Sequence, residues 1–389
     1  MRLALTRPQL LVAALLVLAV VALIMGLVFP PNDSSAAAAT SGGPSVLLVG
    51  EFETTVTTLS AVHPSDPTQR RQIHAVEHAP GWDIVGATSP DGQRLAYLVL
   101  PPDARDPQTE ASLVLLEDLD RTDGPRARTL FRGADLRGAL AWSGDGASLF
   151  VRTTTTDADG RPTFELWEIN AVDGQQRSLL RRSDILGLYP VGRAGNGPTY
   201  SVSVGLNGSE LLVIEASAGG GAVERRPLSP LITRSWTLSP DGSQLAFTEQ
   251  QGLDLRVRVA ALAAGSAEIA VAAALDANGF DSTGGTASPT WHPDGSLSVG
   301  TLGHGESGAP TLRVQANGSS ATIDSERRDG FALPIAWSPQ GSHLAVRTFS
   351  GVGPGAPGEE NAAVIDANGI SRAIPGEFVR ILGWWSANG

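Results

Sequence analysis

The turn Leu238-Ser239-Pro240-Asp241-Gly242 and the strand-like run Gln244-Leu245-Ala246-Phe247-Thr248 decide the fold of this chain, because the pair recurs along the sequence. Other clear copies of the turn are Thr88 to Gly92, Trp142 to Gly146, Trp291 to Gly295 and Trp337 to Gly341. They follow one another at about 50 residues, except for one interval about twice as long. A weaker copy, Arg193 to Gly197 before Thr199 to Val204, lies within that interval, and Trp385 to Gly389 is a partial copy at the end. A unit repeated at this spacing indicates an architecture of stacked supersecondary elements.

Each position of the turn has a physical reason. Pro presets φ, Asp or Asn tolerates tight turns, and Gly supplies a positive φ without steric cost. The residue before Ser is a tryptophan in four copies: Trp142, Trp291, Trp337 and Trp385. We expect these rings to pack between units rather than to form a ligand cage. A second set of turns lies about midway: Asp173-Gly174, Asp276 to Gly279, Gln315 to Gly318 and Asp366 to Gly369. A unit therefore reads as four antiparallel strands, which is one propeller blade.

The number of blades follows from the two ends of the repeat region. Six strands follow a copy of the turn. The turn at Trp385 has no strand after it, and the strand Ser45 to Val49 has no turn before it. Thr55 to Val62 and Gln72 to Glu77 are predicted partners of that first strand. The two fragments complete one blade if the C-terminal strand pairs with the N-terminal ones, which also removes exposed sheet edges. Seven units of about 49 residues then fill 45–389, and this length is close to that of a four-stranded propeller blade. A ring of six blades would leave the two fragments unplaced.

The turn and its following strand resemble the WD40-like PD40 repeat of TolB-type propellers, over nearly the whole chain after residue 44. The resemblance implies an all-β, seven-bladed propeller. It is poorly specific for function, since the same propeller occurs in binding proteins, in lyases and beside the hydrolase domain of some serine peptidases. TolB proteins also carry a small α/β domain before the propeller, for which this chain has no room, so the TolB role is not carried over.

The first 44 residues have a different composition. Residues 10–29 carry no charge and are about 30 Å long as a helix, enough to span a bilayer core. Arg2 and Arg7 precede this run, and no basic residue follows until Arg70. We therefore expect a cytoplasmic tail at 1–9, an uncleaved transmembrane signal anchor at 10–29, a flexible linker at 30–44 and an extracytoplasmic propeller at 45–389. The rival interpretation is a signal peptide cleaved near Ala36 to Ala39.

Composition excludes several classes of protein. The net charge of −12 argues against nucleic acid and anionic membrane surfaces as partners. Because the chain has no cysteine, it has no disulfide, thiol nucleophile or lipid-modified cysteine. All 28 basic residues are arginine and Gly and Ala are abundant, which is typical of a bacterium with a GC-rich genome.

Candidate metal ligands occur in three places, and each has a simpler interpretation. His74 to His78 matches H-x-x-E-H, but that chemistry needs a helix, and residues four apart on a strand are separated by about 13 Å. The acidic segments Asp157 to Gly160 with Glu165, and Asp118 to Gly124, resemble fragments of calcium loops without the full set of ligands. Both fall where hairpin turns are expected. We predict no metal and no cofactor.

Catalytic motifs are also missing from the sequence. Gly305 to Gly308 lacks the spacing of a nucleophile elbow, and the glycine runs Gly219 to Gly221 and Gly351 to Gly358 are predicted loops rather than phosphate cradles. Asn207 and Asn317 fit the glycosylation pattern but are better interpreted as hairpin turns. The repeated acids are expected to shape their turns instead of forming a catalytic ring: Asp91, Asp145, Asp241 and Asp294.

We therefore expect a membrane-anchored, non-catalytic module that binds a protein or a cell-envelope glycan near the central channel. The longer loops would build the site: Pro101 to Glu110, Asn278 to Pro289 and Phe349 to Asn361. The alternative is a propeller lyase or hydrolase acting on cell-envelope polysaccharide, which needs convergent histidines from the set His63, His74, His78, His292, His304 and His343. A third hypothesis is the sensor half of a larger membrane complex. The sequence names neither the ligand nor the oligomeric state.

Overall fold

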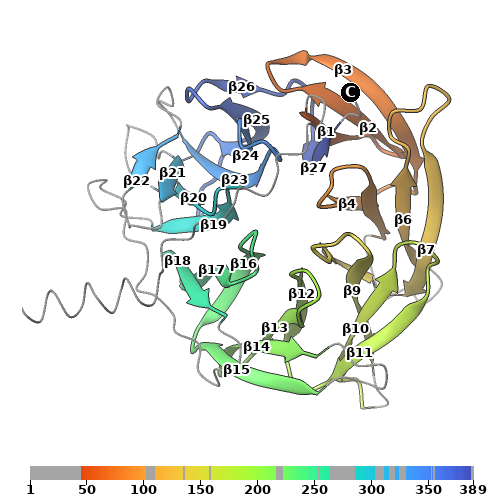
Figure 1. Ribbon diagram of the computed structural model, residues 1–389, viewed down its shortest axis with the longest axis vertical. Coiled ribbons are helices and arrows are strands. Elements are labelled where there is room, and N and C mark those ends of the chain that lie inside the picture. The colour runs from red at the N-terminus through yellow and green to blue at the C-terminus, as the bar shows by residue number, and fades with distance from the viewer. Residues whose placement is uncertain are drawn as a thin grey trace, which may run out of the picture. The chain divides into compact units, whose positions relative to one another are not determined.

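The computed structural model describes residues 45–101, 110–134, 136–156, 159–215, 222–252, 254–262, 285–302, 311–314, 320–323, 330–351, 353 and 355–386. These residues form seven antiparallel sheets, which confirms the predicted seven-bladed propeller (Figure 1). Within these ranges no helix is long and apolar enough to cross a membrane. The predicted anchor at 10–29 and linker at 30–44 lie outside the described residues.

The blades are numbered along the chain, and each is named by its strands from the first to the fourth. Blade 1 contains β27 (Val379–Ser386), β1 (Ser45–Phe52), β2 (Val56–His63) and β3 (Asp66–Glu77). Blade 2 contains β4 (Asp83–Thr88), β5 (Leu95–Leu100), β6 (Glu110–Glu117) and β7 (Arg126–Ala134). Blade 3 contains β8 (Leu136–Trp142), β9 (Ser148–Thr156), β10 (Pro162–Asn170) and β11 (Gln176–Arg182). Blade 4 contains β12 (Gly187–Arg193), β13 (Thr199–Gly205), β14 (Gly208–Ile214) and β15 (Val223–Ser229).

The remaining blades follow the same order. Blade 5 contains β16 (Ile232–Leu238), β17 (Gln244–Gln251) and β18 (Asp254–Ala261). Blade 6 contains β19 (Thr286–Trp291), β20 (Leu297–Thr301), β21 (Thr311–Val314) and β22 (Ser320–Thr322). Blade 7 contains β23 (Phe331–Trp337), β24 (His343–Phe349), β25 (Glu360–Asp366) and β26 (Ser371–Ala373). Blade 5 thus has three strands in the described part of the chain, and the segment 263–284 that follows β18 lies outside it.

Blade 1 joins the two ends of the repeat region. β27 pairs antiparallel with β1, and Trp385 lies opposite Val46 in the register. The first strands of the blades contact one another in turn, from β27 to β4 and onward through β8, β12, β16, β19 and β23 back to β27. Because the ring closes through strand pairing, each blade packs between two neighbours.

The hydrophobic core lies between the sheets. Clusters of buried side chains join adjacent blades, for example Leu98 of blade 2 with Leu149 of blade 3, and Phe150 of blade 3 with Leu212 of blade 4. Since side chains on a strand alternate between its two faces, each sheet contributes to the core on both sides.

Antiparallel order gives the propeller two ends with different connections. The turns between first and second strands and between third and fourth strands lie at one end, which we call the turn end. The connections between second and third strands, and those from one blade to the next, lie at the other end, which we call the loop end. The predicted loop Asn278 to Pro289 is shorter at its C-terminal side than expected, because β19 already begins at Thr286.

Candidate functional site

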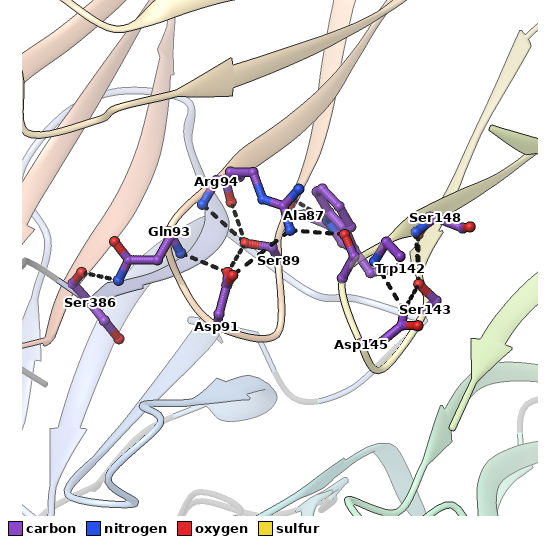
Figure 2. A network of polar contacts seen from close by, with 12 residues as sticks. Ala87, Ser89, Asp91, Gln93, Arg94, Trp142, Ser143, Asp145, Ser148 and Ser386 are labelled. Carbon is purple, nitrogen blue, oxygen red and sulfur yellow. Dashed lines mark hydrogen bonds and ion pairs between the residues drawn. The ribbon is translucent and has the colours of Figure 1, made fainter. Parts of the chain in front are cut away.

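The repeated acids shape the turns in which they lie. In blade 2, Asp91 Oδ1 accepts hydrogen bonds from Ser89 Oγ at 2.5 Å and from Gln93 N at 3.0 Å, while Arg94 N donates to Ser89 Oγ at 3.0 Å (Figure 2). Gly92 has a φ of 68°, which completes the turn. The same bonds recur in blade 3 through Ser143 and Asp145, and in blade 5 through Ser239 and Asp241.

The repeated tryptophans join neighbouring blades. Trp142 Nε1 donates to the Ala87 carbonyl of blade 2 at 3.0 Å, and the Arg94 guanidinium lies 5.2 Å from the centre of the Trp142 ring. Arg94 Nη2 also donates to the Gly146 carbonyl at 2.8 Å. Trp291 of blade 6 donates in the same way to the Thr237 carbonyl of blade 5. The predicted packing role is therefore confirmed for these rings.

In the closing blade, two consecutive tryptophans pack between blades, and the predicted packing of Trp385 is confirmed. Trp384, rather than the repeat tryptophan Trp385, donates to the preceding blade, at the Ala336 carbonyl and 3.0 Å. Trp385 faces the other way and is buried beside residues of blades 1 and 2, with the Arg71 guanidinium 5.0 Å from its ring centre. Ser386 N donates to the Gly92 carbonyl at 3.0 Å, so the last turn contacts the first.

Two turns depart from the pattern. Gln340 replaces the acid in blade 7, and it accepts a hydrogen bond from Ser45 Oγ across the closing seam. His292 replaces serine in blade 6, where Nδ1 lies 2.6 Å from Asp294 Oδ1 and Nε2 lies 3.1 Å from the Gly341 carbonyl of blade 7. Burial alone would raise the pKa of Asp294, but hydrogen bonds from Ser296 and His292 lower it to about 2.

The other described histidines are distributed over blades 1 and 7. His74 lies on β3 opposite Leu59, and burial lowers its pKa. His78 follows β3 and bonds to Thr57 Oγ1 through Nε2 at 2.9 Å. The predicted strand at the H-x-x-E-H motif is thus present, and its geometry does not bring both rings to one metal.

Titratable groups of blades 1 and 7 lie near His343. Burial lowers its pKa, Asp366 acts in the opposite direction, and Arg372 and His63 lower it further. Asp366 already accepts hydrogen bonds from Asn368 N, Ile370 N and Arg372, and so holds the turn between β25 and β26. This group lies at the turn end, and Asp366 and Arg372 belong to the β25–β26 hairpin of blade 7. His304 lies outside the described residues.

The acidic segments are hairpin turns where they are described. Asp118 has a φ of 57° and its carbonyl accepts from Arg121 N, while Arg121 forms an ion pair with Asp123. Asp157 lies outside the described residues. In the described ranges no group of three or more His, Asp or Glu side chains is placed to hold a metal ion.

A groove of about 710 Å³ lies at the loop end between blades 3 and 4. Blade 4 contributes the sheet face that carries Ser203, Glu210 and Pro227, whose strands are in register. Blade 3 contributes Arg182 and Asp184, at the end of β11 and just beyond it. This groove was not predicted from the sequence, because its walls come from segments of two blades.

The tip of the β13–β14 turn borders the groove. Leu206 and Asn207 form a two-residue turn, and Leu206 is 89% exposed. Gly208 has a φ of 114°, and a Cβ there would lie 2.2 Å from the Ser229 carbonyl oxygen. The predicted hairpin at Asn207-Gly208 is confirmed, and glycine is required because the turn packs directly on the chain leading to β16.

Charged pairs line both walls. Arg182 forms two hydrogen bonds of 2.6 Å with Asp184, and Arg225 donates to both oxygens of Glu210 at 2.8 to 3.1 Å. Arg182 Nη1 lies 4.0 Å from Glu210 Oε2, which links the two pairs across the groove. The Arg182 hydrogen bond lowers the pKa of Asp184, with smaller contributions from the charges of Arg182 and Arg225. The charges on the walls therefore alternate in sign.

The fold defines the class of protein: an all-β, seven-bladed propeller of antiparallel sheets. No protein-family model matches the chain, and no curated protein matches it in sequence. Among solved structures, TolB from Acinetobacter baumannii has a TM-score of 0.50 and 16% identity, over 88% of this chain and 82% of that chain.

Two further structures extend the comparison. Oligogalacturonate lyase from Vibrio parahaemolyticus has a TM-score of 0.55 and 11% identity, covering 87% of each chain. The propeller domain of the Trilobed protease from Pyrococcus furiosus has a TM-score of 0.54 and 10% identity, over 87% of this chain and 96% of that chain. The TM-scores show a shared fold, which confirms the resemblance to TolB-type propellers. At these low identities the activities belong to the compared proteins alone.

Proposed function

We propose that this protein is a non-catalytic binding scaffold whose partner is a protein or another ligand of the cell envelope. The observation that carries the proposal is the groove at the loop end, which combines a volume of about 710 Å³ with the exposed side chain of Leu206. The volume lies within the range of about 300 to 1,000 Å³ that is typical of ligand sites.

The described histidines support the binding role over the alternative lyase or hydrolase. His292 bonds to its own turn and to Gly341, and His78 bonds to a neighbouring strand. General acid–base catalysis needs such groups within hydrogen-bonding reach of one substrate. Side chains that are already engaged in turns and strands favour a structural role.

The proposed location is the extracytoplasmic side of the cytoplasmic membrane. Its support is the sequence of residues 1–44, an uncharged run preceded by two arginines. Extraction of membranes with alkaline carbonate, followed by protease treatment of intact spheroplasts, tests this placement. Release of the chain by carbonate, or protection of the propeller from external protease, would contradict it.

The binding role is tested by crosslinking in intact membranes and purification of the full-length chain. We expect a defined protein or cell-wall component that is enriched over an unrelated anchored protein. In parallel, purified chain is incubated with cell-envelope polysaccharide, and new chain ends are measured. Enrichment of no component, or formation of new ends that depends on the protein, would overturn the proposal.

A further inference from the structure

Exposed aliphatic side chains gather around the groove. Besides Leu206, Leu186 is 57% exposed and Ile232 is 49% exposed. Leu186 N donates to the Val204 carbonyl at 2.7 Å, which places it beside the end of β13. Thr233 N donates to Ser209 Oγ at 3.1 Å, and Ser209 Oγ donates to the Leu231 carbonyl at 3.0 Å, which places Ile232 beside the start of β14. The three side chains therefore belong to segments that meet at the groove.

The lining of the groove distinguishes among ligand classes. Among the described residues that line it, the apolar ones are aliphatic or proline, namely Ile185, Leu206, Pro227, Leu228 and Pro230, and none is aromatic. Aromatic rings supply large, rigid surfaces for stacking planar or cyclic ligands, so their absence here argues against a sugar ring. Aliphatic side chains with a charged rim are the surroundings in which protein interfaces place an apolar anchor.

The exposed charges differ in sign on the two walls. Asp184, on the blade 3 wall, has a side chain 63% exposed, and Arg225, on the blade 4 wall, has one 53% exposed. Their partners are less exposed, at 12% for Arg182 and 34% for Glu210. A ligand entering from solvent thus meets a negative charge on one side and a positive charge on the other. A peptide segment with an acidic and a basic residue on either side of an apolar one complements this pattern.

A second copy of the chain is a poorer occupant. The net charge of −12 makes two copies repel each other, and the groove offers no excess of positive charge to offset that repulsion.

We infer that the groove between blades 3 and 4 is a docking site for an extended segment of a protein partner. The segment inserts an aliphatic or aromatic side chain beside Leu206 and Ile185, places an acidic residue against Arg225, and places a basic residue against Asp184. This inference rests on the proposed scaffold function and narrows it to a protein partner and to one site.

The test uses a random peptide library displayed on phage, selected on the full-length protein. We expect enriched peptides with an apolar anchor between acidic and basic residues. The Leu206→Asp variant should weaken their binding roughly 30-fold, the loss typical of a hot-spot residue. Val172→Asp is the matched control, because Val172 is 73% exposed on the turn between β10 and β11 at the turn end. It should leave binding unchanged.

Several outcomes would overturn the inference. Equal binding of the enriched peptides to Leu206→Asp and Val172→Asp would place their site elsewhere. Neutral oligosaccharides that displace the peptides from the groove at equal concentration would identify a glycan site. A dimer in sedimentation that Leu206→Asp dissociates would identify a second copy as the occupant. A partner captured in the membrane experiment whose binding ignores Leu206→Asp would refute this site and leave the scaffold function standing.

Two further measurements separate a folding defect from a recognition defect: the unfolding temperature of Leu206→Asp and the peptide preference of Arg225→Gln. Because Leu206 is almost fully exposed, Leu206→Asp should unfold at the same temperature as the wild type. Arg225→Gln should keep the apolar preference of the selected peptides and lose the acidic one. An unchanged acidic preference would contradict the role given to Arg225.

Discussion

Replacement of Trp142 by phenylalanine is the most informative perturbation of the propeller, because this side chain joins two blades. The variant loses the hydrogen bond from Nε1 to the Ala87 carbonyl, which contributes about 1 kcal/mol. The indole is only 9% exposed, so the smaller phenyl ring leaves a cavity that lowers the free energy of unfolding by a further amount of about 1 to 2 kcal/mol. We expect the free energy of unfolding to fall by about 2 to 3 kcal/mol.

Urea denaturation followed by far-ultraviolet circular dichroism measures this loss without relying on the tryptophan signal. The midpoint should shift while the slope stays constant, since the surface exposed on unfolding is nearly unchanged. Phe378→Leu is a matched control, because Phe378 is 79% exposed and its replacement should change stability by less than about 0.5 kcal/mol.

A double-mutant cycle of Arg94→Ala with Trp142→Leu, which removes the aromatic ring, isolates the stacking of Arg94 on the indole. The coupling should be about 0.5 to 1 kcal/mol, the value expected for a partly exposed cation–π contact. A Trp142→Phe variant that is as stable as the Phe378→Leu control would refute the inter-blade role of the indole.

Three further predictions concern single residues. Gly208→Ala should destabilise the protein by about 1 to 3 kcal/mol in thermal unfolding, because its φ of 114° is strained for alanine and the new Cβ would meet the Ser229 carbonyl; a wild-type melting temperature would contradict this. The pKa of Asp294 is about 2 in the folded state, below its usual value. Its ionised form therefore stabilises the folded protein at neutral pH, and this stabilisation is lost as the pH falls from about 4 to 2. The Asp294 side chain is half exposed, so Asp294→Asn should reduce the loss of unfolding free energy between about pH 4 and 2 by no more than about 1 kcal/mol. A larger reduction would contradict the geometry of this ion pair. Burial raises the pKa of Tyr97 to about 12, so the neutral phenol stabilises the folded protein, and this stabilisation is lost as the pH rises above about 10. An ultraviolet absorbance titration of Tyr97→Phe should therefore lack one phenol that ionises late in the wild type.

The turn sequence predicted the propeller because its chemistry is local. Asp91, Asp145 and Asp241 act on backbone groups two residues away, so the sequence alone carries both the turn and its spacing. The number of blades followed from the same spacing and from the two half-blades that end at Ser386 and begin at Ser45.

The contacts between blades were harder to predict. A register shift in the pairing of β1 with β27 separates Leu48 from Val49, and Trp384 rather than Trp385 makes the hydrogen bond to the preceding blade. Bulges of this kind are not visible in an alternating pattern. The predicted packing of Trp385 between blades is confirmed, but its sequence position did not indicate that Trp384 would make the hydrogen bond.

The groove was missed for a related reason. Arg182 and Glu210 approach each other only after β11 and β14 have packed in neighbouring blades, and no local motif reports that distance. One signal was present in the sequence: Leu206 stands in a two-residue turn between Gly205 and Gly208, where an apolar side chain has no core to enter. An exposed leucine at such a turn is a reason to search for a binding surface.

Hydrogen–deuterium exchange of the full-length protein, with and without a peptide selected from the library, tests the proposed binding role most directly. We predict slower exchange in residues 182–186, 203–210 and 225–233, which surround the groove, and no change in the turns at Ser89 and Ser143. Slower exchange at the turn end, or bound peptide that protects no backbone amide around the groove, would contradict the assignment of this groove as the site of recognition.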